Sequence, residues 1–279
     1  MIYMRFPGGK GKALTLSYDD GVGADLRLMK IMKKHGIKGT FNINSGLFAP
    51  EGTVFEDGKE QGRLTEELIR KNYDDPDFEV AVHGLYHIHL NHASSEEAIT
   101  DIAEDRKNLE ALFNRPVRGM AYAFGGYSEK VVSLLKSMGI AYSRTVVTTQ
   151  RFDLPKEPLT LHPTCHHNNP RLAELCGNFL SGVPRYEAQM FYLWGHSYEF
   201  DDDNNWNVIE DFCEKMGGHD DIWYATNIEI IDYINAYKSL IRSFDGKIIQ
   251  NPTATDIYIT ENRSGKNYVI KAGETIHLD

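Results

Sequence analysis

"LTLSYDDGVG", residues 14–23, places two adjacent carboxylates, Asp19 and Asp20, directly after an apolar run and before Gly21. Asp and Gly favour turns, so the simplest interpretation is a strand that ends here. A second interpretation gives the two acids different roles, one holding a cation and the other moving a proton. Adjacent strand residues point to opposite faces, so both acids reach one site only if the chain curls, which Gly21 permits.

Short β-like runs alternate with helical patterns on either side of this stretch and along most of the chain. We expect strands over residues 12–18, 39–44, 78–84, 117–125, 140–147, 188–196 and 221–226. We expect helices over residues 25–36, 64–72, 94–114, 128–139, 206–217 and 227–242. The alternation predicts an α/β fold with a parallel sheet covered by helices. The chain length favours a closed or nearly closed β/α barrel over an open doubly wound sheet.

The end of the chain has a different character. Residues 245–279 contain short β-like runs separated by Gly, Asn and Ser. We therefore predict a barrel domain over residues 1–244 and a small β-rich appendage over residues 245–279.

Composition disfavours several functional classes. The formal net charge of −10 argues against a nucleic-acid or anionic-membrane partner, because both select clustered Lys and Arg. No apolar run approaches the length of a membrane span, and the N-terminus has no basic segment followed by an apolar one. We therefore expect a cytoplasmic protein, unless a signal peptide has been removed. The chain has three cysteines and no CxxC, which fits free thiols in a reducing compartment.

Polar residues end several of the predicted strands, and the chemistry of α/β barrels lies at the C-terminal ends of their strands. Asp19 and Asp20 end the first strand, His83 ends the third with His87 shortly after it, and His196 ends the run "FYLWG". A His-x-x-x-His spacing puts two imidazoles on one face if the segment turns helically. Two imidazoles and a carboxylate form a common ligand set for a divalent metal.

Three of these stretches, in this order, resemble motifs of the polysaccharide deacetylase family, that is, the NodB-homology domain of carbohydrate esterase family 4. They are "LSYDDG" (16–21), "HGLYH" (83–87) and "YLWGH" (192–196), and the resemblance spans roughly residues 12–240. It implies a distorted (β/α)7 barrel that removes N- or O-linked acetyl groups from a carbohydrate. It also implies a divalent metal, usually zinc, although the same ligands accept cobalt or nickel.

Carried over residue by residue, the resemblance assigns a role to each polar group. Asp20, His83 and His87 would hold the metal, Asp19 would be the general base for the metal-bound water, and His196 would be the general acid. Hydrolysis of an acetamide needs an activated water, a stabilised oxyanion and a proton for the leaving amine, which these groups can supply.

The third family motif departs from the usual pattern. Many sugar-active members have Arg-Pro-Pro-Tyr-Gly where this chain has "AYAFGG" (121–126), so that Ala121 stands in place of the Arg. In the family, that Arg orients and tunes the base. Arg144, at the end of a nearby predicted strand, is a candidate for the missing cation, and a surface Arg is the alternative.

Further residues are predicted to contact the substrate. Trp194 and Tyr122 flank the site and would form an acetyl pocket or a sugar platform, unless they belong to the barrel core. A backbone N–H near Phe124 or Gly125 could complete an oxyanion site. The histidines of "LHPTCHH" (161–167) would line the groove, form a second metal site or lie in a loop. The predicted substrate-binding set is Tyr122, Phe124, Arg144, His166 and Trp194.

Two other functions fit the same sequence. One is a deamidase of the same superfamily that acts on a small non-sugar C–N bond, which the missing motif Arg keeps open. The other is a catalytically silent carbohydrate-binding barrel. The presence of both Asp19 and His196 favours an enzyme over a silent protein.

Overall fold

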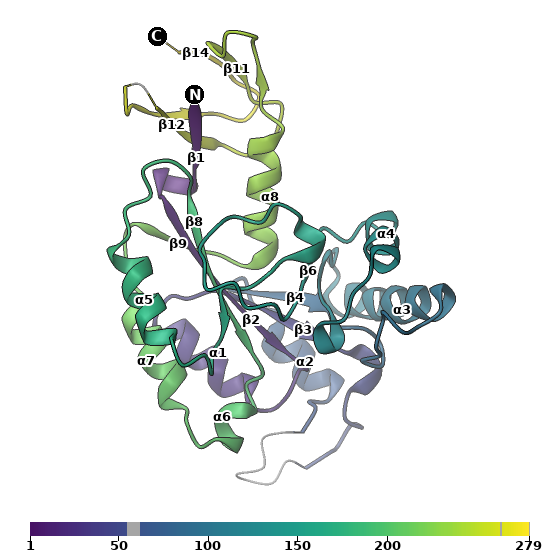
Figure 1. Cartoon of the computed structure of the whole chain (residues 1–279). Coiled ribbons are helices and arrows are strands. Elements are labelled where there is room, and N and C mark those ends of the chain that lie inside the picture. The colour runs from purple at the N-terminus through teal and green to yellow at the C-terminus, as the bar shows by residue number, and fades with distance from the viewer. Residues whose placement is uncertain (55–61, 263, 279) are drawn as a thin grey trace.

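The computed structural model describes residues 1–54, 62–262 and 264–278. Its centre is a curled parallel sheet of 8 strands in the order β6-β5-β4-β3-β2-β8-β7, with β9 paired to β2 beside this path. Helices lie around the outside of the sheet (Figure 1). The arrangement confirms the predicted distorted (β/α)7 barrel.

The elements of the barrel follow the predicted alternation closely. Its strands are β2 (Lys12–Asp19), β3 (Gly39–Ile43), β4 (Phe78–Val82), β5 (Gly119–Ala121), β6 (Tyr142–Arg144), β7 (Cys165–His166), β8 (Gln189–Gly195) and β9 (Ile222–Tyr224). Its helices are α1 (Asp25–Lys34), α2 (Glu66–Tyr73), α3 (Ser95–Phe113), α4 (Glu129–Ser137), α5 (Leu172–Ser181), α6 (Glu199–Asp202), α7 (Asn207–Met216) and α8 (Asn227–Lys238). Of the helices in these described ranges, none is both long and apolar enough to cross a membrane.

Strand β2 lies at the centre of the sheet and carries the stretch with which the sequence analysis began. It is buried along its whole length and pairs in parallel with β3, β8 and β9. Parallel strands covered on both faces are rich in apolar residues, which Ala13, Leu14, Leu16 and Tyr18 supply in β2. The polar residues that follow its apolar run therefore lie at the C-terminal rim of the barrel.

The barrel elements α5, α6 and β7 were not predicted from the sequence. Helix α5 buries Leu172, Leu175, Cys176 and Phe179, which have the 3,4 spacing of a helix face. Strand β7 is only two residues long and pairs in parallel with β8, His166 lying opposite Trp194. His166 and His167 therefore lie at a strand end at the same rim, whereas His162 precedes β7.

Two small antiparallel sheets lie at one end of the molecule, together with both chain termini (Figure 1). One contains β1 (Ile2–Arg5), β12 (Ile257–Glu261) and β13 (Asn267–Ile270), and the other β10 (Ile241–Arg242), β11 (Ile248–Gln250) and β14 (Thr275–His277). Strand β1 thus pairs with the C-terminal segment and not with the barrel sheet. The division into domains at residue 244 stays a prediction.

Candidate active site

The chain curls where β2 ends. The adjacent acids Asp19 and Asp20 can reach one site only with such a curl. Asp19 is the last residue of β2, and Asp20 has a φ of 89° and Gly21 a φ of 66°. A positive φ is costly for Asp, and such strain concentrates at functional sites. Arg63 holds Asp20 in this conformation, because its guanidinium donates to the Asp20 carbonyl and, at 2.9 Å, to Oδ1.

Asp19 is buried and ionised. Its Oδ2 accepts a hydrogen bond from the Arg144 guanidinium, and its Oδ1 accepts one from Asn42 Nδ2 at 2.8 Å. Burial raises the pKa of Asp19, but the positive charge of Arg144 beside it outweighs burial and lowers this pKa to about 2. The carboxylate is therefore available as a proton acceptor at neutral pH.

Arg144 occupies the position that the missing motif residue leaves open. Strands β5 and β6 pair with Ala121 directly opposite Arg144, so the cation comes from the neighbouring strand at the same level of the sheet. Arg144 is fully buried, and its guanidinium carbon lies 4.4 Å from the centre of the Trp194 ring. The prediction that Arg144 binds substrate is therefore corrected, because its contacts are with Asp19 and Trp194.

Replacing Arg144 with Leu is expected to lower the free energy of unfolding by about 3–5 kcal/mol, because the Asp19 carboxylate stays buried without its counterion. Chemical denaturation monitored by circular dichroism measures this change. Arg151→Leu is a matched control, since Arg151 and its partner Asp153 are both exposed and should contribute within about 1 kcal/mol. Equal effects of the two replacements would contradict the structural role of the buried pair.

Asp20, His83 and His87 converge beside Asp19 and form a group able to hold a metal ion. Asp20 Oδ1 lies 3.9 Å from His83 Nε2 and 3.8 Å from His87 Nε2. Asp19 Oδ2 lies 3.7 Å from the same His83 nitrogen. These separations are too long for hydrogen bonds and leave space for an ion among the ligand atoms.

The protonation pattern of His83 fits a cation at this position. Its Nδ1 lies 2.9 Å from the Ala121 carbonyl oxygen, so Nδ1 carries the proton and Nε2 has a free lone pair. This Nε2 is buried and has no hydrogen-bond partner among the described residues. Burial also lowers the pKa of His87 to about 4, which keeps that imidazole neutral. Neutral imidazoles facing a carboxylate are the donor set that zinc and related ions select.

His83 and His87 do not lie on a helical turn, although their spacing suggests one. Residues 83–88 form no helix, and α3 begins only at Ser95. Gly84 has a φ of 84° and His87 a φ of 55°, so the backbone between the two histidines is irregular. Convergence of their side chains thus depends on an irregular loop, and not on helical periodicity.

His196 faces the same site from the end of β8. Its Nε2 lies 3.8 Å from Asp19 Oδ2, and its Nδ1 lies 2.9 Å from Glu199 Oε1. Burial lowers the pKa of His196, but the hydrogen bond to Glu199 and the charge of Asp19 outweigh burial and raise it. These contacts favour the protonated form of the imidazole, which has one nitrogen toward the site.

Glu199 is shared by three imidazoles. Its Oε2 lies 3.1 Å from His166 Nε2 and 2.9 Å from His167 Nε2. Burial raises the pKa of Glu199, but these contacts and that with His196 lower it well below its usual range. His166 Nδ1 accepts a hydrogen bond from the Asn168 amide at 3.2 Å, which leaves the proton on Nε2, toward Glu199. A proton there favours a hydrogen-bond network, although His166, His196 and Glu199 are also close enough to share a metal.

The remaining predicted substrate contacts differ in exposure. Tyr122 is 1% exposed and donates to the Leu159 carbonyl, so its prediction as a substrate contact is corrected: it is a core residue. Trp194 is 8% exposed and packs on Arg144. Phe124 is 58% exposed, with its ring centre 4.4 Å from that of His87. The Gly125 amide donates to the Tyr122 carbonyl within its own turn, which leaves the Phe124 amide as the candidate for an oxyanion contact.

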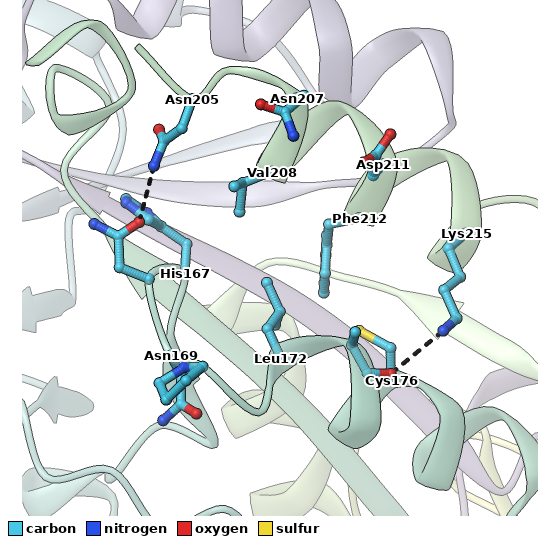
Figure 2. A pocket seen from close by; sticks show the side chains of 13 residues that line it. His167, Asn169, Leu172, Cys176, Asn205, Asn207, Val208, Asp211, Phe212 and Lys215 are labelled. Atoms are coloured by element: carbon cyan, nitrogen blue, oxygen red, sulfur yellow. Dashed lines mark hydrogen bonds between the residues drawn. The ribbon is translucent and has the colours of Figure 1, made fainter. Parts of the chain in front are cut away.

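A cavity of about 420 Å³ lies between α5 and α7, outside the group of acids and histidines (Figure 2). Leu172, Val208 and Phe212 form apolar walls, and Lys215 donates to the Ala173 carbonyl at 3.3 Å. His167 lines this cavity and also contacts Glu199. The cavity therefore borders the candidate site at one residue and does not contain it.

Comparison with known families gives a match over the part of the chain that carries the first motifs. The family model for polysaccharide deacetylases matches residues 7–143. The match covers 137 of the 279 residues and shows a polysaccharide deacetylase domain in this part of the chain. The matched range contains Asp19, Asp20 and the His83–His87 loop, but it ends before Arg144 and His196.

Two solved structures illustrate the proteins that share this fold. One is a putative polysaccharide deacetylase from Mycobacterium smegmatis, with 15% identity, a TM-score of 0.57, and coverage of 86% of this chain and 95% of that one. Another is the Xyl-CE4 domain of a multidomain xylanase from the hindgut metagenome of Trinervitermes trinervoides, with 12% identity, a TM-score of 0.51, and coverage of 81% and 92%. At these identities the similarity shows the fold.

The deacetylase PplD of Streptococcus pyogenes, solved with acetate, has 18% identity and a TM-score of 0.45. The match covers 52% of this chain and 61% of the length of that protein. The comparison with curated proteins found no match.

Proposed function

We propose that this protein is a metal-dependent hydrolase that removes N- or O-linked acetyl groups from a carbohydrate. The observation that carries the proposal is the convergence of three groups at Asp19 Oδ2. This oxygen accepts the Arg144 hydrogen bond and lies 3.7 Å from His83 Nε2 and 3.8 Å from His196 Nε2. An ionised base, a candidate metal ligand and an imidazole whose pKa is raised thus lie around one point.

Asp20, His83 and His87 would hold the metal. A bound divalent cation supplies a Lewis acid that polarises the acetyl carbonyl and makes a water molecule more acidic. Three protein ligands leave coordination positions open, as catalytic metal sites require. Zinc is the expected ion, and cobalt or nickel suits the same donor atoms.

Asp19 would accept the proton of the attacking water at Oδ2. Arg144 lowers the pKa of Asp19 in spite of burial, so this carboxylate stays ionised until the water approaches. Asn42 holds the other oxygen, Oδ1, at 2.8 Å, so the carboxylate cannot rotate away. The pair of neighbouring acids in the sequence is then explained by two separate tasks, ligation by Asp20 and proton transfer by Asp19.

His196 would donate the proton that the leaving nitrogen or oxygen needs. Its Nε2 points toward Asp19 Oδ2, and Glu199 fixes Nδ1 as the second protonated nitrogen. A general acid must be protonated before it acts, so activity should fall as pH rises through the raised pKa of His196.

Replacing Glu199 with Gln is expected to shift the alkaline limb of the kcat profile to lower pH. The Glu199 charge and hydrogen bond raise the pKa of His196, so their loss lowers it and less of the acid form remains at neutral pH. The pH dependence of acetate release measures the shift. Asp202→Asn, an exposed change of equal charge in α6, is the control. An unshifted alkaline limb in Glu199→Gln would contradict this role.

The deamidase alternative drew its support from the missing motif Arg. Since Arg144 contacts Asp19 from the adjacent strand, that departure no longer separates this chain from sugar-active relatives.

Acetate release from acetylated chito-oligosaccharides and acetylated xylan, compared with turnover of cyclic amides, tests the substrate class. Each reaction is run with and without a chelator. We expect acetate from at least one sugar, abolished by the chelator and restored by added metal. Turnover of the amides alone would support the deamidase, and sugar binding without acetate release by the metal-loaded protein would support a silent binding barrel.

A further inference from the structure

The loop that carries His83 and His87 needs support from outside, because its own conformation is irregular. Gly84 and His87 both have positive φ, and no helical hydrogen bonds connect the two histidines. A loop with such a backbone does not by itself fix the direction of its side chains. The elements that bind its backbone therefore decide whether the two imidazoles converge on Asp20.

Two buried acids of α3 bind the amide groups of this loop. Asp105 accepts a hydrogen bond from the His83 amide at 3.0 Å through Oδ2, and one from the Ser45 amide at 2.7 Å through Oδ1. Asp101 lies four residues earlier, on the same face of α3, and its Oδ1 accepts from the Tyr86 amide at 2.9 Å. The backbone carbonyl of Asp101 also accepts from the Leu85 amide at 3.1 Å.

Asn44 binds the carbonyl groups of the same loop. Its Nδ2 donates to the His83 carbonyl at 2.8 Å and to the Gly84 carbonyl at 2.7 Å. Its Oδ1 accepts from Arg63 at 2.7 Å, and Arg63 in turn binds Asp20. One continuous set of hydrogen bonds thus links the histidine loop to the third candidate ligand.

Close packing at Gly84 adds to this support. A Cβ atom at this position would collide with Asp101 Oδ2, so the loop lies directly against the helix. Asp101 and Asp105 are 5% and 0% exposed. Burying two carboxylates is unfavourable, and an apolar pair would join helix and sheet without that cost. Their hydrogen bonds to the amides of His83 and Tyr86 indicate a role that apolar side chains cannot perform.

We propose that Asp101 and Asp105, with Asn44, are positioning residues that hold His83 and His87 in the geometry for metal binding. The inference rests on the proposed function, because it concerns the same metal. Residues that orient metal ligands in this way commonly change metal affinity about 10- to 100-fold when they are replaced. The three residues would set how tightly the site binds its ion without touching the ion.

The test is metal affinity in Asp105→Asn, measured by competition of zinc with a chromophoric chelator at a temperature where the metal-free protein is folded. Asn keeps one acceptor oxygen but turns an NH₂ toward the other amide, so the loop loses one of its fixed points. We expect the dissociation constant for zinc to rise about 10- to 100-fold. The visible spectrum of the cobalt-loaded variant should also differ from that of the wild type.

Glu104→Gln is the matched control, because it removes the same charge from the exposed face of α3, where Glu104 pairs with Lys107. Asp101→Ala removes the acceptor of the Tyr86 amide and tests the same inference if Asp105→Asn does not fold. A folded Asp105→Asn or Asp101→Ala variant that binds zinc within about twofold of wild type, with the same cobalt spectrum, overturns the inference. A wild-type chain that binds no metal would instead overturn the proposed function, and this inference with it.

Discussion

Asp19→Asn is expected to lower kcat for acetate release about 10²- to 10⁴-fold while the protein still binds its metal. The amide has nearly the shape of the carboxylate but cannot accept the proton, and general bases contribute rate factors of this size. The ligands Asp20, His83 and His87 are unchanged, so metal affinity should stay near that of the wild type. Single-turnover acetate release and metal titration on the same preparation measure the two quantities.

The replacement also leaves Arg144 buried without a counterion, so both assays must be run well below the unfolding transition. Asp153→Asn, at an exposed pair with Arg151, is the matched control and should leave kcat unchanged. Near-normal turnover by Asp19→Asn would show that another group takes the proton. Loss of metal together with activity would show that Asp19 is itself a ligand.

His83→Ala is expected to remove metal binding and, with it, all metal-dependent turnover. His83 is buried, its Nδ1 is fixed by the Ala121 carbonyl, and its Nε2 points at the two acids. No neighbouring side chain can take over its position without rebuilding the loop. Titration with zinc should show saturable binding in the wild type and none in the variant over the same concentration range.

His92→Ala is the control for this experiment, because His92 lies in the same connection between β4 and α3 but is exposed. It should bind metal as the wild type does. Saturable binding of equal affinity in His83→Ala would mean that the ion is held elsewhere, for example at the cluster of His166, His196 and Glu199.

Much of the barrel and the convergence of its polar residues could be predicted from the sequence. Alternating apolar runs and helical patterns located most strands, and parallel strands bring their C-terminal ends to one rim. Asp19, His83 and His196 each lie at the end of such a run, so their arrival at one rim needed no knowledge of loop conformation. The capping boxes of Ser94 with Glu97 and of Thr226 with Glu229 depend on local spacing alone, so their signal is also present in the sequence.

The groups that surround Asp19 depended on long-range geometry. That Arg144 lies opposite Ala121 follows from the register of β5 with β6, which neither strand encodes by itself. The spacing of His83 and His87 suggested a helical turn, whereas the structure has a loop with two positive φ angles held by α3. Such support comes from residues about 20 positions away in sequence and leaves no periodic signal.

Glu199 illustrates a signal that was present but not used. It lies three residues after His196, a spacing that brings side chains together when the chain turns helically, and α6 begins at Glu199 itself. Strand β7, too short for a pattern of its own, then brings His166 and His167 to the same carboxylate. A strand of two residues cannot be recognised from alternation, which needs at least four.

The most direct measurement of the central claim is anomalous diffraction at the zinc edge from a crystal of the metal-loaded protein. The account predicts a single strong peak about 2.0–2.2 Å from Asp20 Oδ1, His83 Nε2 and His87 Nε2. Asp19 should lie beside the ion without ligating it. A peak at His166, His196 and Glu199 with none beside Asp20, or no peak at all in a fully active enzyme, would contradict the account.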